Sequence, residues 1–567
     1  MKETLKRYWG YDGFRPKQEE IISSVLSGRD TLAILPTGGG KSICFQVPAL
    51  MREGICIVVS PLIALMKDQV LNLRARGIKA LAVYSGMSHN DIDITLDNAI
   101  YGDYKFLYVS PERLRTELFE ARVSKMKVNF LVVDEAHCIS QWGYDFRPDY
   151  LEIAKIRGIL PKGPPCIALT ATATPQVAAD IMEKLGFAQE NLIRAGFERP
   201  NLSYIFRECE DKMGQMLKVC SMPGSGIVYV SRRKSAEDLA AFLRSQGVNA
   251  ESYHAGLSSG ARSLIQDRWK DGETRVIVST NAFGMGIDKG EVRFVCHYDM
   301  PDSLEAYFQE AGRAGRDGKK AYAVLLWNEN DIRRLKQITK STFPPLEYIR
   351  DIYQKVFMFL DIPYECGAGA SRKFDLEEFA KKYKLHAPTA YYAIKYIEQS
   401  GYWALSDELE IPSKLRFCVA RDALYRVQME NEDLDTFIKV IMRTYTGIFN
   451  GYVSIDEQRI AKLGHYAVDV VKERLHTLSR MQVVNYLPRF TATLLNIGNE
   501  RLTEDNLRLP QSEYDERVSC RERRLDAIIN LVEDDSECRV TRMLKYFGQD
   551  ESKPCGSCDV CRLRNVK

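Results

Sequence analysis

A chain of 567 residues exceeds the usual size of one domain and indicates three or four compact units. Its composition, 45% hydrophobic and 27% charged, is that of an ordinary globular protein and excludes a mainly disordered chain. The 79 lysines and arginines almost balance the 76 acidic residues, so the formal net charge is only +3. A nucleic-acid partner must therefore be argued from local motifs, because the total charge does not indicate one.

The sequence favours a protein without a membrane partner. Its first residues carry charges where a signal peptide needs an apolar segment, and the longest apolar run, 55–66, contains a serine and a proline and is too short to span a bilayer. Ten of the 14 cysteines are scattered singly, which is typical of buried thiols in a reducing compartment. We expect a cytoplasmic protein associated with the chromosome, or a nuclear protein in a eukaryote.

Short apolar runs alternate with helical patterns as far as residue 335. The runs that end in polar or glycine-rich loops are 57–60, 106–110, 130–133, 166–169, 226–230, 276–280, 294–298 and 322–326. Runs of this kind are typical of parallel strands that helices cover on both faces. The sequence therefore predicts the α/β fold class, with two parallel-sheet lobes at 1–196 and 197–343 and ligands at the carboxyl ends of the strands.

After Pro344 the alternation gives way to helical patterns with short strand-like pieces. Two stretches there, 374–405 and 453–487, resemble each other, since both predict a helix, a turn, an amphipathic helix and a short aromatic strand. This order is similar to a winged helix-turn-helix. We predict a mainly helical, winged-helix-like region at 344–510 and a separate module at 511–567.

The segment 33–42 follows an apolar run and precedes a helix, as a phosphate-binding loop does. The residues that form its turn are Thr37, Gly38, Gly39 and Gly40. Glycines let backbone N–H groups turn toward phosphates, and the helix N-terminus adds its positive end. Lys41 can then reach the β and γ oxygens of ATP, and Ser42 can hold Mg²⁺. A glycine-rich turn that only caps a helix is the structural alternative.

The apolar run 130–133 ends in two carboxylates, Asp134 and Glu135. We predict that Asp134 holds Mg²⁺, usually through water, and that Glu135 orients and deprotonates the attacking water. Such pairs are also common on protein surfaces. The phosphate loop in the same lobe favours the catalytic interpretation.

A third segment, 309–318, supplies Gln309, Arg313 and Arg316. The two arginines are three residues apart and share a helix face, and the glycines of the segment allow the backbone to approach closely. From the second lobe they could neutralise charge on the γ-phosphate when the cleft closes. We therefore predict a catalytic role for the three residues, with a solvated charge run as the alternative.

Together these motifs resemble those of superfamily-2 helicases, specifically the RecQ family, over residues 9–335. The resemblance implies two RecA-like motor lobes. Residues 9–18 resemble the family's adenine-sensing motif, which implies that Gln18 reads the adenine edge and that Arg15 supports it. The segments that resemble the strand-tracking and coupling motifs are 60–69, 110–114, 169–173, 253–257 and 280–289. The last of these implies that Gly286 and Asp288 belong to the nucleotide site.

The segment 140–148 resembles the aromatic-rich loop of the RecQ family and is the most family-specific motif. Trp142 and Phe146 offer ring faces on which bases can stack, and Arg147 can contact a phosphate or a base plane. Because the loop follows Glu135 closely, we predict that it senses single-stranded DNA and reports to the hydrolysis site. The alternative is that both rings are ordinary core aromatics.

Four cysteines crowd the end of the sequence: Cys538, Cys555, Cys558 and Cys561. The two-residue gaps let thiolates converge on one tetrahedral ion, for which Zn²⁺ is the default. The surrounding residues resemble the RecQ zinc module. Arg539 and Arg542 on its helix are candidate phosphate contacts.

The order of the parts differs from the usual RecQ order, in which the zinc module follows the second lobe and a winged helix comes after it. Here 344–510 lies between lobe and zinc module, either as a displaced winged helix or as an unrelated insertion. Tyr402 and Trp403, before a predicted hairpin at Ser406 and Asp407, are candidates for separating strands. Core packing is the better prediction for both aromatics.

The sequence as a whole predicts an ATP-dependent DNA helicase that uses ATP, Mg²⁺ and Zn²⁺ and binds single-stranded and duplex DNA. The family resemblance implies 3′ to 5′ polarity and a role in recombination and repair, and we expect the monomer to be active. One alternative is a translocase that moves on DNA without separating its strands. The other is a nucleotide-dependent regulator that binds duplex DNA.

Overall fold

The computed structural model describes residues 1–143, 145–161, 163–283, 289–405, 409–411, 413–419, 424–425, 429, 432–449, 451–488, 490–550 and 552–565. The chain divides into two compact units, one formed by Met1–Gln337 with Asp515–Lys567 and the other by Ile338–Tyr514. Among the residues that the structure describes, no helix has the length and apolar character needed to cross a membrane.

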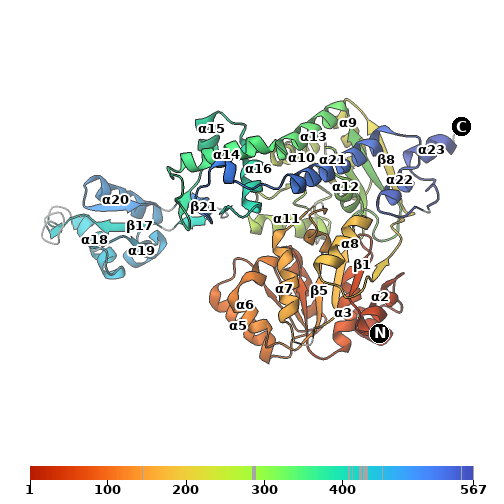
Figure 1. The fold of residues 1–567 in the computed structure, drawn as a ribbon, viewed down its shortest axis with the longest axis horizontal. Helices are drawn as coiled ribbons and strands as arrows, with labels where there is room; N and C mark the ends of the chain where they lie inside the picture. The colour runs from red at the N-terminus through yellow and green to blue at the C-terminus, as the bar shows by residue number, and fades with distance from the viewer. Residues whose placement is uncertain are drawn as a thin grey trace. The chain divides into compact units, whose positions relative to one another are not determined.

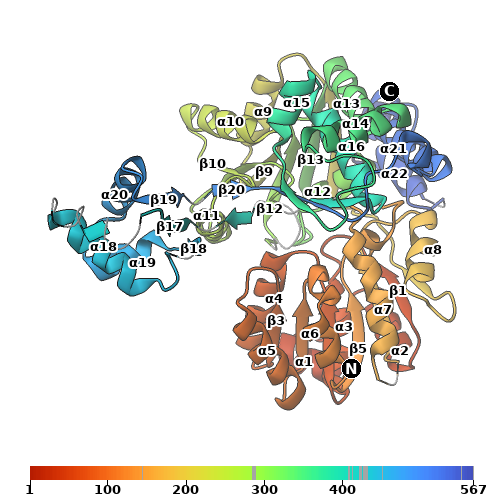
Figure 2. The ribbon, with the colours of Figure 1, turned by 60° about the vertical axis from the view of Figure 1, so that its left-hand side comes forward.

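The first lobe is a seven-stranded parallel sheet with the order β3-β4-β2-β5-β6-β1-β7. Every residue of β2 and β4 is buried, because helices cover both faces of the sheet. In Figure 2, β1 and β5 lie among helices coloured red to orange. The strands are β1 (Thr31–Ile34), β2 (Ile55–Val59), β3 (Ala80–Val83), β4 (Phe106–Val109), β5 (Val128–Val133), β6 (Cys166–Thr170) and β7 (Leu192–Arg194). The helices are α1 (Lys2–Trp9), α2 (Gln18–Leu26), α3 (Lys41–Met51), α4 (Ile63–Ala75), α5 (His89–Tyr101), α6 (Glu117–Val123), α7 (Glu152–Ile159) and α8 (Pro175–Lys184), with 3-10 turns at Pro111–Arg115, Ala136–Ile139 and Pro148–Leu151.

The second lobe is a six-stranded parallel sheet with the order β10-β11-β9-β12-β13-β8. The predicted pair of parallel-sheet lobes is therefore confirmed. The strands are β8 (Leu202–Glu208), β9 (Ser225–Tyr229), β10 (Ala250–Tyr253), β11 (Val276–Ser279), β12 (Val292–His297) and β13 (Ala321–Trp327). The helices are α9 (Lys212–Cys220), α10 (Arg233–Ser245), α11 (Ser259–Asp271), α12 (Leu304–Ala311) and α13 (Glu329–Thr342).

The predicted repeat is present in the second unit, which begins with α14 (Leu346–Phe359). The pair α15 (Leu376–Tyr383) and α16 (Ala387–Gln399) recurs as α19 (Glu457–Gly464) and α20 (Val468–Arg480), each 81 residues further on (376 to 457, 387 to 468). The strands β14 (Ser371–Lys373) and β15 (Trp403–Leu405) recur as β18 (Val453–Ser454) and β19 (Val484–Leu487). Figure 1 shows α18 (Glu432–Thr444), α19 and α20 gathered around β17.

The two helix-turn-helix pairs also begin and end alike. Asp375 and Asp456 cap α15 and α19, and each side chain accepts a hydrogen bond from the backbone N–H two residues further on. Lys384 and His465 end these helices in the left-handed conformation, with φ of 54° and 57°. The same local signals therefore fold the two copies.

The two copies exchange their central strands. The first sheet has the order β14-β21-β15 and the second has the order β18-β17-β19. β17 (Lys414–Phe417) follows the first helix pair in the chain but lies in the second sheet, and β21 (Leu494–Ile497) follows the second pair but completes the first sheet. Between them β16 (Leu409–Ile411) pairs with β20 (Phe490–Ala492), so an antiparallel ribbon connects the copies. Each winged helix therefore depends on a strand from the other.

Tyr402 and Trp403 belong to the core of the first winged helix. Trp403 is 3% exposed, stacks on Tyr353 with ring centroids 5.5 Å apart, and donates from its indole nitrogen to the Ile394 carbonyl at 3.1 Å. Tyr402 donates its hydroxyl to the Arg508 carbonyl at 3.0 Å. Their candidacy for strand separation was wrong and the core interpretation is confirmed. The predicted hairpin at Ser406 and Asp407 lies outside the described residues.

The cysteine-rich end of the chain folds onto the second lobe, in the first unit. Its helices are α21 (Gln511–Glu533), α22 (Arg539–Tyr546) and α23 (Asp559–Asn565), and in Figure 1 α21 runs beside α12. The ring of Phe547 lies 5.4 Å from that of Phe197 and 5.2 Å from that of Phe308. Because all three rings are buried, the module and the lobe share one core.

Candidate active site

A cavity of about 880 Å³ is lined by residues from both lobes. It brings together twelve of the residues that the sequence singled out: Arg15, Gln18, Thr37, Gly38, Gly40, Lys41, Ser42, Asp134, Glu135, Gln309, Arg313 and Arg316. Gly39 lies between two of these lining residues. Gly286 and Asp288 fall outside the described residues.

The phosphate loop joins β1 to α3 and can be built only with glycine at its turn. A Cβ on Gly39 would lie 2.8 Å from the Pro36 carbonyl oxygen, and Gly40 has a φ of 78° at the N-cap of α3. A side chain at either position would clash or strain the backbone. Within the loop the Gly39 N–H donates to the Pro36 carbonyl at 2.8 Å, and the N-terminus of α3 offers its positive end to an anion.

Gln18 and Arg15 are bonded to the phosphate loop itself. The Gln18 amide nitrogen donates to the Gly39 and Gly40 carbonyls at 3.2 and 3.0 Å, and its oxygen accepts from the Arg15 backbone N–H at 2.8 Å. Arg15 donates to the Gly38 carbonyl. A nucleotide base that bonds to Gln18 would therefore act directly on the loop that holds its phosphates.

Lys41 and the two carboxylates form a buried electrostatic cluster. Lys41 Nζ lies 3.0 Å from Glu135 Oε1. Burial opposes the charge of Lys41, but Glu135 and Asp134 outweigh it and raise the lysine pKa. Burial, followed by the proximity of Glu135, raises the pKa of Asp134 to about 6. One lysine thus faces two carboxylates, which leaves an oxygen-rich site with unneutralised negative charge that suits Mg²⁺.

Glu135 is held in an unusual backbone conformation. Its φ of 49° lies in the left-handed region, which is uncommon for a residue with a side chain. Burial raises the pKa of Glu135, but Lys41, His137 and Arg313 together lower it. His137 Nδ1 lies 3.5 Å from Glu135 Oε2 and 2.9 Å from the Thr170 hydroxyl. These charges favour the ionised carboxylate, which lies beside His137, and His137 in turn is bonded to Thr170 at the end of β6.

The loop after Glu135 is folded onto the protein. Trp142 is partly buried and packs against the core, and its backbone N–H donates to the Ser140 hydroxyl at 3.2 Å. Arg147 is paired with Asp145 at 3.0 Å and donates to the Pro61 carbonyl at 3.1 Å. Phe146 is partly exposed. The core therefore leaves only part of the Trp142 ring exposed to a stacking base.

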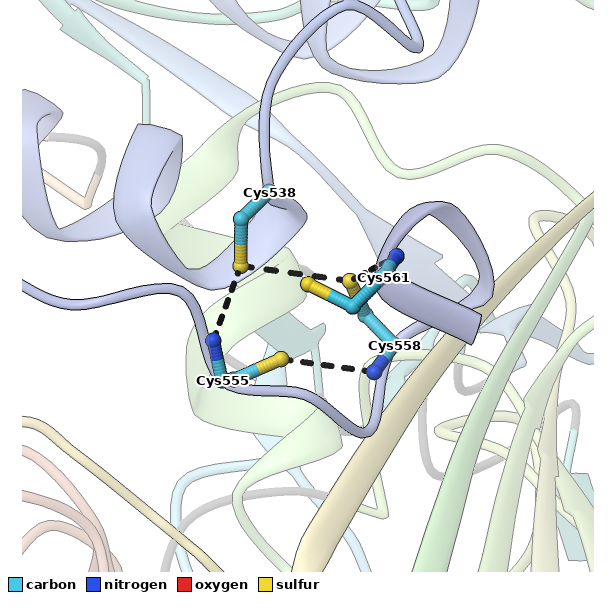
Figure 3. Close-up of side chains that lie close together, drawn as sticks. All are labelled: Cys538, Cys555, Cys558 and Cys561. Carbon is cyan, nitrogen blue, oxygen red and sulfur yellow. Dashed lines mark hydrogen bonds between the residues drawn. The ribbon is translucent and has the colours of Figure 1, made fainter. Parts of the chain in front are cut away.

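The four C-terminal cysteines point toward a common centre (Figure 3). Their sulfur atoms all lie within 4.8 Å of one another, and those of Cys538 and Cys558 are 3.9 Å apart. Sulfurs that bind one Zn²⁺ tetrahedrally at ~2.3 Å are about 3.8 Å apart. Backbone N–H groups of Cys555, Cys558 and Cys561 donate to neighbouring cysteine sulfurs at 3.3 to 3.4 Å, which stabilises thiolates. The residues therefore fit a structural Zn²⁺ site.

Comparisons with known proteins assign these parts. Family models match residues 15–181 (DEAD/DEAH box helicase), 211–318 (helicase conserved C-terminal domain), 415–488 (RecQ helicase winged-helix domain, Bacteroidota) and 499–562 (RecQ zinc-binding). The probable ATP-dependent DNA helicase RecS of Bacillus subtilis is 41% identical over 358 residues, which cover 62% of this chain and 72% of that protein. The chain belongs to the RecQ family.

The match to other RecQ relatives covers only part of their length. The ATP-dependent DNA helicase RecQ of Pasteurella multocida is 44% identical over 338 residues, covering 59% of this chain and 53% of that protein, so this chain spans about half the length of such relatives. A solved structure, the DUF1998 helicase MrfA bound to DNA, has a TM-score of 0.51 at 19% identity and covers 58% of this chain and 50% of its own. That likeness shows the fold alone.

Within this RecQ protein, the zinc-binding match supports the interpretation of the cysteines, but the interpretation of Arg539 as a phosphate contact was wrong. Arg539 is 5% exposed, pairs with Asp559 at 3.3 Å and lies over the Phe206 ring. Arg542 donates to the Asn530 carbonyl at 2.8 Å and pairs with Asp534. Both guanidinium groups hold the module together, but only Arg539 is buried away from a phosphate, and the partly exposed Arg542 stays a predicted phosphate contact.

Arg199, next to the candidate site of this RecQ protein, is a residue that sequence reasoning missed. It donates to the Gly312, Ala314 and Gly315 carbonyls at 3.2, 2.7 and 2.9 Å, and lies 3.5 Å from the Thr37 carbonyl in the phosphate loop. It therefore fixes the turn that carries Arg313 and Arg316 beside the phosphate loop. No motif signals this role, because the acceptors are backbone atoms distant in sequence.

Proposed function

We propose that this protein is an ATP-dependent DNA helicase that unwinds duplex DNA with 3′ to 5′ polarity. The observation that carries the proposal is the cavity in which the phosphate loop and two carboxylates of the first lobe meet Gln309, Arg313 and Arg316 of the second. A site built from two lobes is completed only when the lobes close. Relatives named ATP-dependent DNA helicase support the same conclusion.

Each residue of the cavity has a proposed part in hydrolysis. Lys41 and the phosphate-loop N–H groups bind the β and γ phosphates, and Ser42 with Asp134 would hold Mg²⁺. Bound Mg²⁺ would neutralise phosphate charge and orient the γ-phosphate. Glu135, whose pKa is lowered chiefly by Lys41, would accept a proton from the attacking water.

The second lobe would supply positive charge to the transition state. Arg316 lies beside the phosphate loop, since a Cβ on Gly38 would meet its side chain at 3.2 Å. Arg313 is buried and lowers the pKa of Glu135. Together with Gln309 they would stabilise charge that develops on the γ-phosphate and signal its loss to the second lobe. Gly286 and Asp288 remain candidates for the same site.

Single-stranded DNA is the proposed partner of the Trp142 loop. Trp142 and Phe146 would stack on bases and Arg147 would contact the backbone, as the aromatic faces and charge allow. We propose motor lobes at 1–196 and 197–343, a winged-helix region at 344–510 that binds duplex DNA, and a zinc module at 511–567. We further propose an active monomer that works in recombination and repair.

A strand-displacement assay tests the proposal. Duplexes with a 3′ or a 5′ single-stranded tail are incubated with the full-length protein, Mg²⁺ and ATP, and release of the labelled strand is followed. We expect displacement from the 3′-tailed substrate only, and none with a non-hydrolysable ATP analogue. DNA-stimulated ATP hydrolysis without displacement would instead indicate a translocase, and the absence of DNA-stimulated hydrolysis would reject the motor.

A further inference from the structure

We propose that Arg524, on the long helix of the zinc module, is a positioning residue that couples the Trp142 loop to the helix carrying Gln309. This inference rests on the proposed function. It assigns to the zinc module a part in the response to DNA, beyond binding its own metal and stabilising the fold.

The first contact joins Arg524 to the loop. Its guanidinium donates to the backbone carbonyl of Trp142, and Arg524 is 8% exposed. The loop is internally bonded, since the Arg147 N–H donates to the Cys138 carbonyl at 2.8 Å and the Gly143 N–H donates to the Ser140 carbonyl at 2.9 Å. A shift of Trp142 therefore moves the acceptor that Arg524 holds.

The second contact joins Arg524 to α12. Arg524 Nε lies 3.7 Å from Glu305 Oε1, and the same oxygen accepts a hydrogen bond from the Tyr546 hydroxyl at 2.8 Å. Glu305 is 3% exposed, so its charge has little solvent to replace a lost partner. Glu305 precedes Gln309 by four residues on α12 and therefore lies on the same face, one turn away.

These contacts form a continuous path through the first unit. It runs from Trp142, the proposed base-stacking residue, through Arg524 to Glu305, and along α12 to Gln309 and Arg313 in the ATP cavity. Because Arg524 and Glu305 are buried, a displaced Trp142 carbonyl leaves a costly unpaired donor, and the pair must rearrange. DNA bound at the loop would thereby shift α12 relative to the phosphates.

A purely structural role for Arg524, fastening α21 to the second lobe, is the competing explanation. Arg521 provides a matched control, because it lies on the same helix and pairs with Asp302 at 2.9 Å, just before the N-cap of α12. This ion pair joins α21 to the second lobe and does not involve the Trp142 loop. Replacing Arg521 therefore weakens the same docking without breaking the proposed path.

The test compares Arg524→Ala, Arg524→Lys and Glu305→Gln with Arg521→Ala in the full-length protein. Arg524→Lys keeps a positive charge beside Glu305, which guards against a folding defect. It lacks the forked guanidinium donor, which the proposed path requires. For the Arg524 and Glu305 variants we expect saturating single-stranded DNA to stimulate ATP hydrolysis about 10-fold less than in the wild type. We expect DNA-free hydrolysis to stay within about 2-fold, and zinc content and melting temperature to match those of Arg521→Ala.

A double variant separates coupling from stability. If Arg524 acts through the loop, Trp142→Ala with Arg524→Lys loses no more stimulation than Trp142→Ala alone, whereas independent effects multiply. Normal stimulation in the Arg524 variants, an equal loss in Arg521→Ala, or multiplying losses would each overturn the inference. A wild type that DNA does not stimulate would overturn the proposed function itself, which keeps the two failures distinguishable.

Discussion

Lys41 Nζ lies 3.0 Å from Glu135 Oε1, so the cation of the phosphate loop already neutralises the carboxylate that we propose as the general base. A γ-phosphate that binds Lys41 must compete with Glu135 for the same ammonium group. When the lysine moves to the phosphate, Glu135 loses the main charge that lowers its pKa and becomes a stronger base. We therefore propose that nucleotide binding also activates the base.

Replacing Glu135 by glutamine should separate binding from hydrolysis. The amide keeps the shape of the side chain but cannot accept the proton, so we expect Glu135→Gln to lower ATP turnover about 10²–10³-fold while nucleotide still binds. Lys41→Ala should lose both nucleotide binding and ATP turnover. Steady-state ATPase assays with a fluorescent-nucleotide titration measure the two effects, and Glu53→Gln, whose carboxylate pairs with Lys127 at the surface, is the control. Near-normal turnover by Glu135→Gln would reject this residue as the base.

The raised pKa of Asp134 predicts how stability depends on pH without nucleotide. Burial and then Glu135 raise that pKa from 3.8 to about 6, so the folded protein holds the proton more tightly than the unfolded chain does. Stability from this group is fully present below about pH 4 and is lost as the pH rises through about 6. Asp134→Asn should therefore be more stable than the wild type at pH 7, on the order of 1–2 kcal/mol, with the difference vanishing near pH 4. Urea unfolding without added Mg²⁺ measures this difference in stability. A difference that does not vary with pH contradicts the raised pKa of Asp134.

Trp142→Ala and Phe146→Ala should uncouple the motor from DNA. Each lost base stack is worth ~1–3 kcal/mol, so DNA-stimulated hydrolysis should fall about 10-fold or more, and DNA-free hydrolysis much less. The comparison is made over a range of single-stranded DNA concentrations. Tyr101→Ala, which removes a ring that is 78% exposed and does not line the cavity, is a control for the loss of a surface aromatic. Equal losses with and without DNA would favour the core-aromatic interpretation.

The zinc module should stabilise the motor as well as itself. The sequence alone predicts that loss of Cys558 unfolds only the end of the chain, but in the structure Phe547 packs between Phe197 and Phe308 of the second lobe. Cys558→Ser should therefore release zinc and also lower the melting temperature of the motor.

A second variant isolates that packing. We expect Phe547→Ala to cost about 3–5 kcal/mol because its fully buried ring leaves a cavity, while Lys545→Ala, an exposed change on the same helix, should be nearly neutral. Chemical unfolding followed by metal analysis reports both effects. A motor that melts unchanged in Cys558→Ser would show that the shared core contributes little.

The ribbon between the winged helices predicts a viable deletion. Ile411 pairs directly with Phe490, so 412–489 can be replaced by Asn-Gly, a two-residue turn that closes β16 onto β20. We expect this variant to keep the first winged helix folded. A chain stopped at residue 450 lacks β21, and its first winged helix should unfold. Circular dichroism and limited proteolysis distinguish the two; an equally folded first winged helix in both would contradict the strand exchange.

The sequence predicts most of the motor because its signals are local. Continuous apolar runs give the strands, and glycines at 38–40 with Lys41 and Ser42 give the phosphate loop. Arg199 and Arg524 could not be found this way, because each bonds to backbone carbonyls of segments distant in the chain.

The exchanged strands were beyond prediction for a related reason. Leu415 and Phe417 in β17, and Leu495 and Ile497 in β21, show the same alternation of buried residues, so either strand suits either sheet. Only the pairing of distant segments decides between them. The helix pairs, in contrast, were predictable because caps and apolar spacing act within one turn of helix.

The strand exchange also sets the order in which this part of the chain can fold during synthesis. β14 and β15 emerge from the ribosome long before β21, and in the meantime β17 is the nearest strand with a matching pattern. An early hairpin between β15 and β17 would be a local, rapidly formed intermediate that differs from the final pairing. Such a hairpin would have to open before β21 could pair, so we expect the exchange of one strand for its own repeat to be a slow step in the folding of this region.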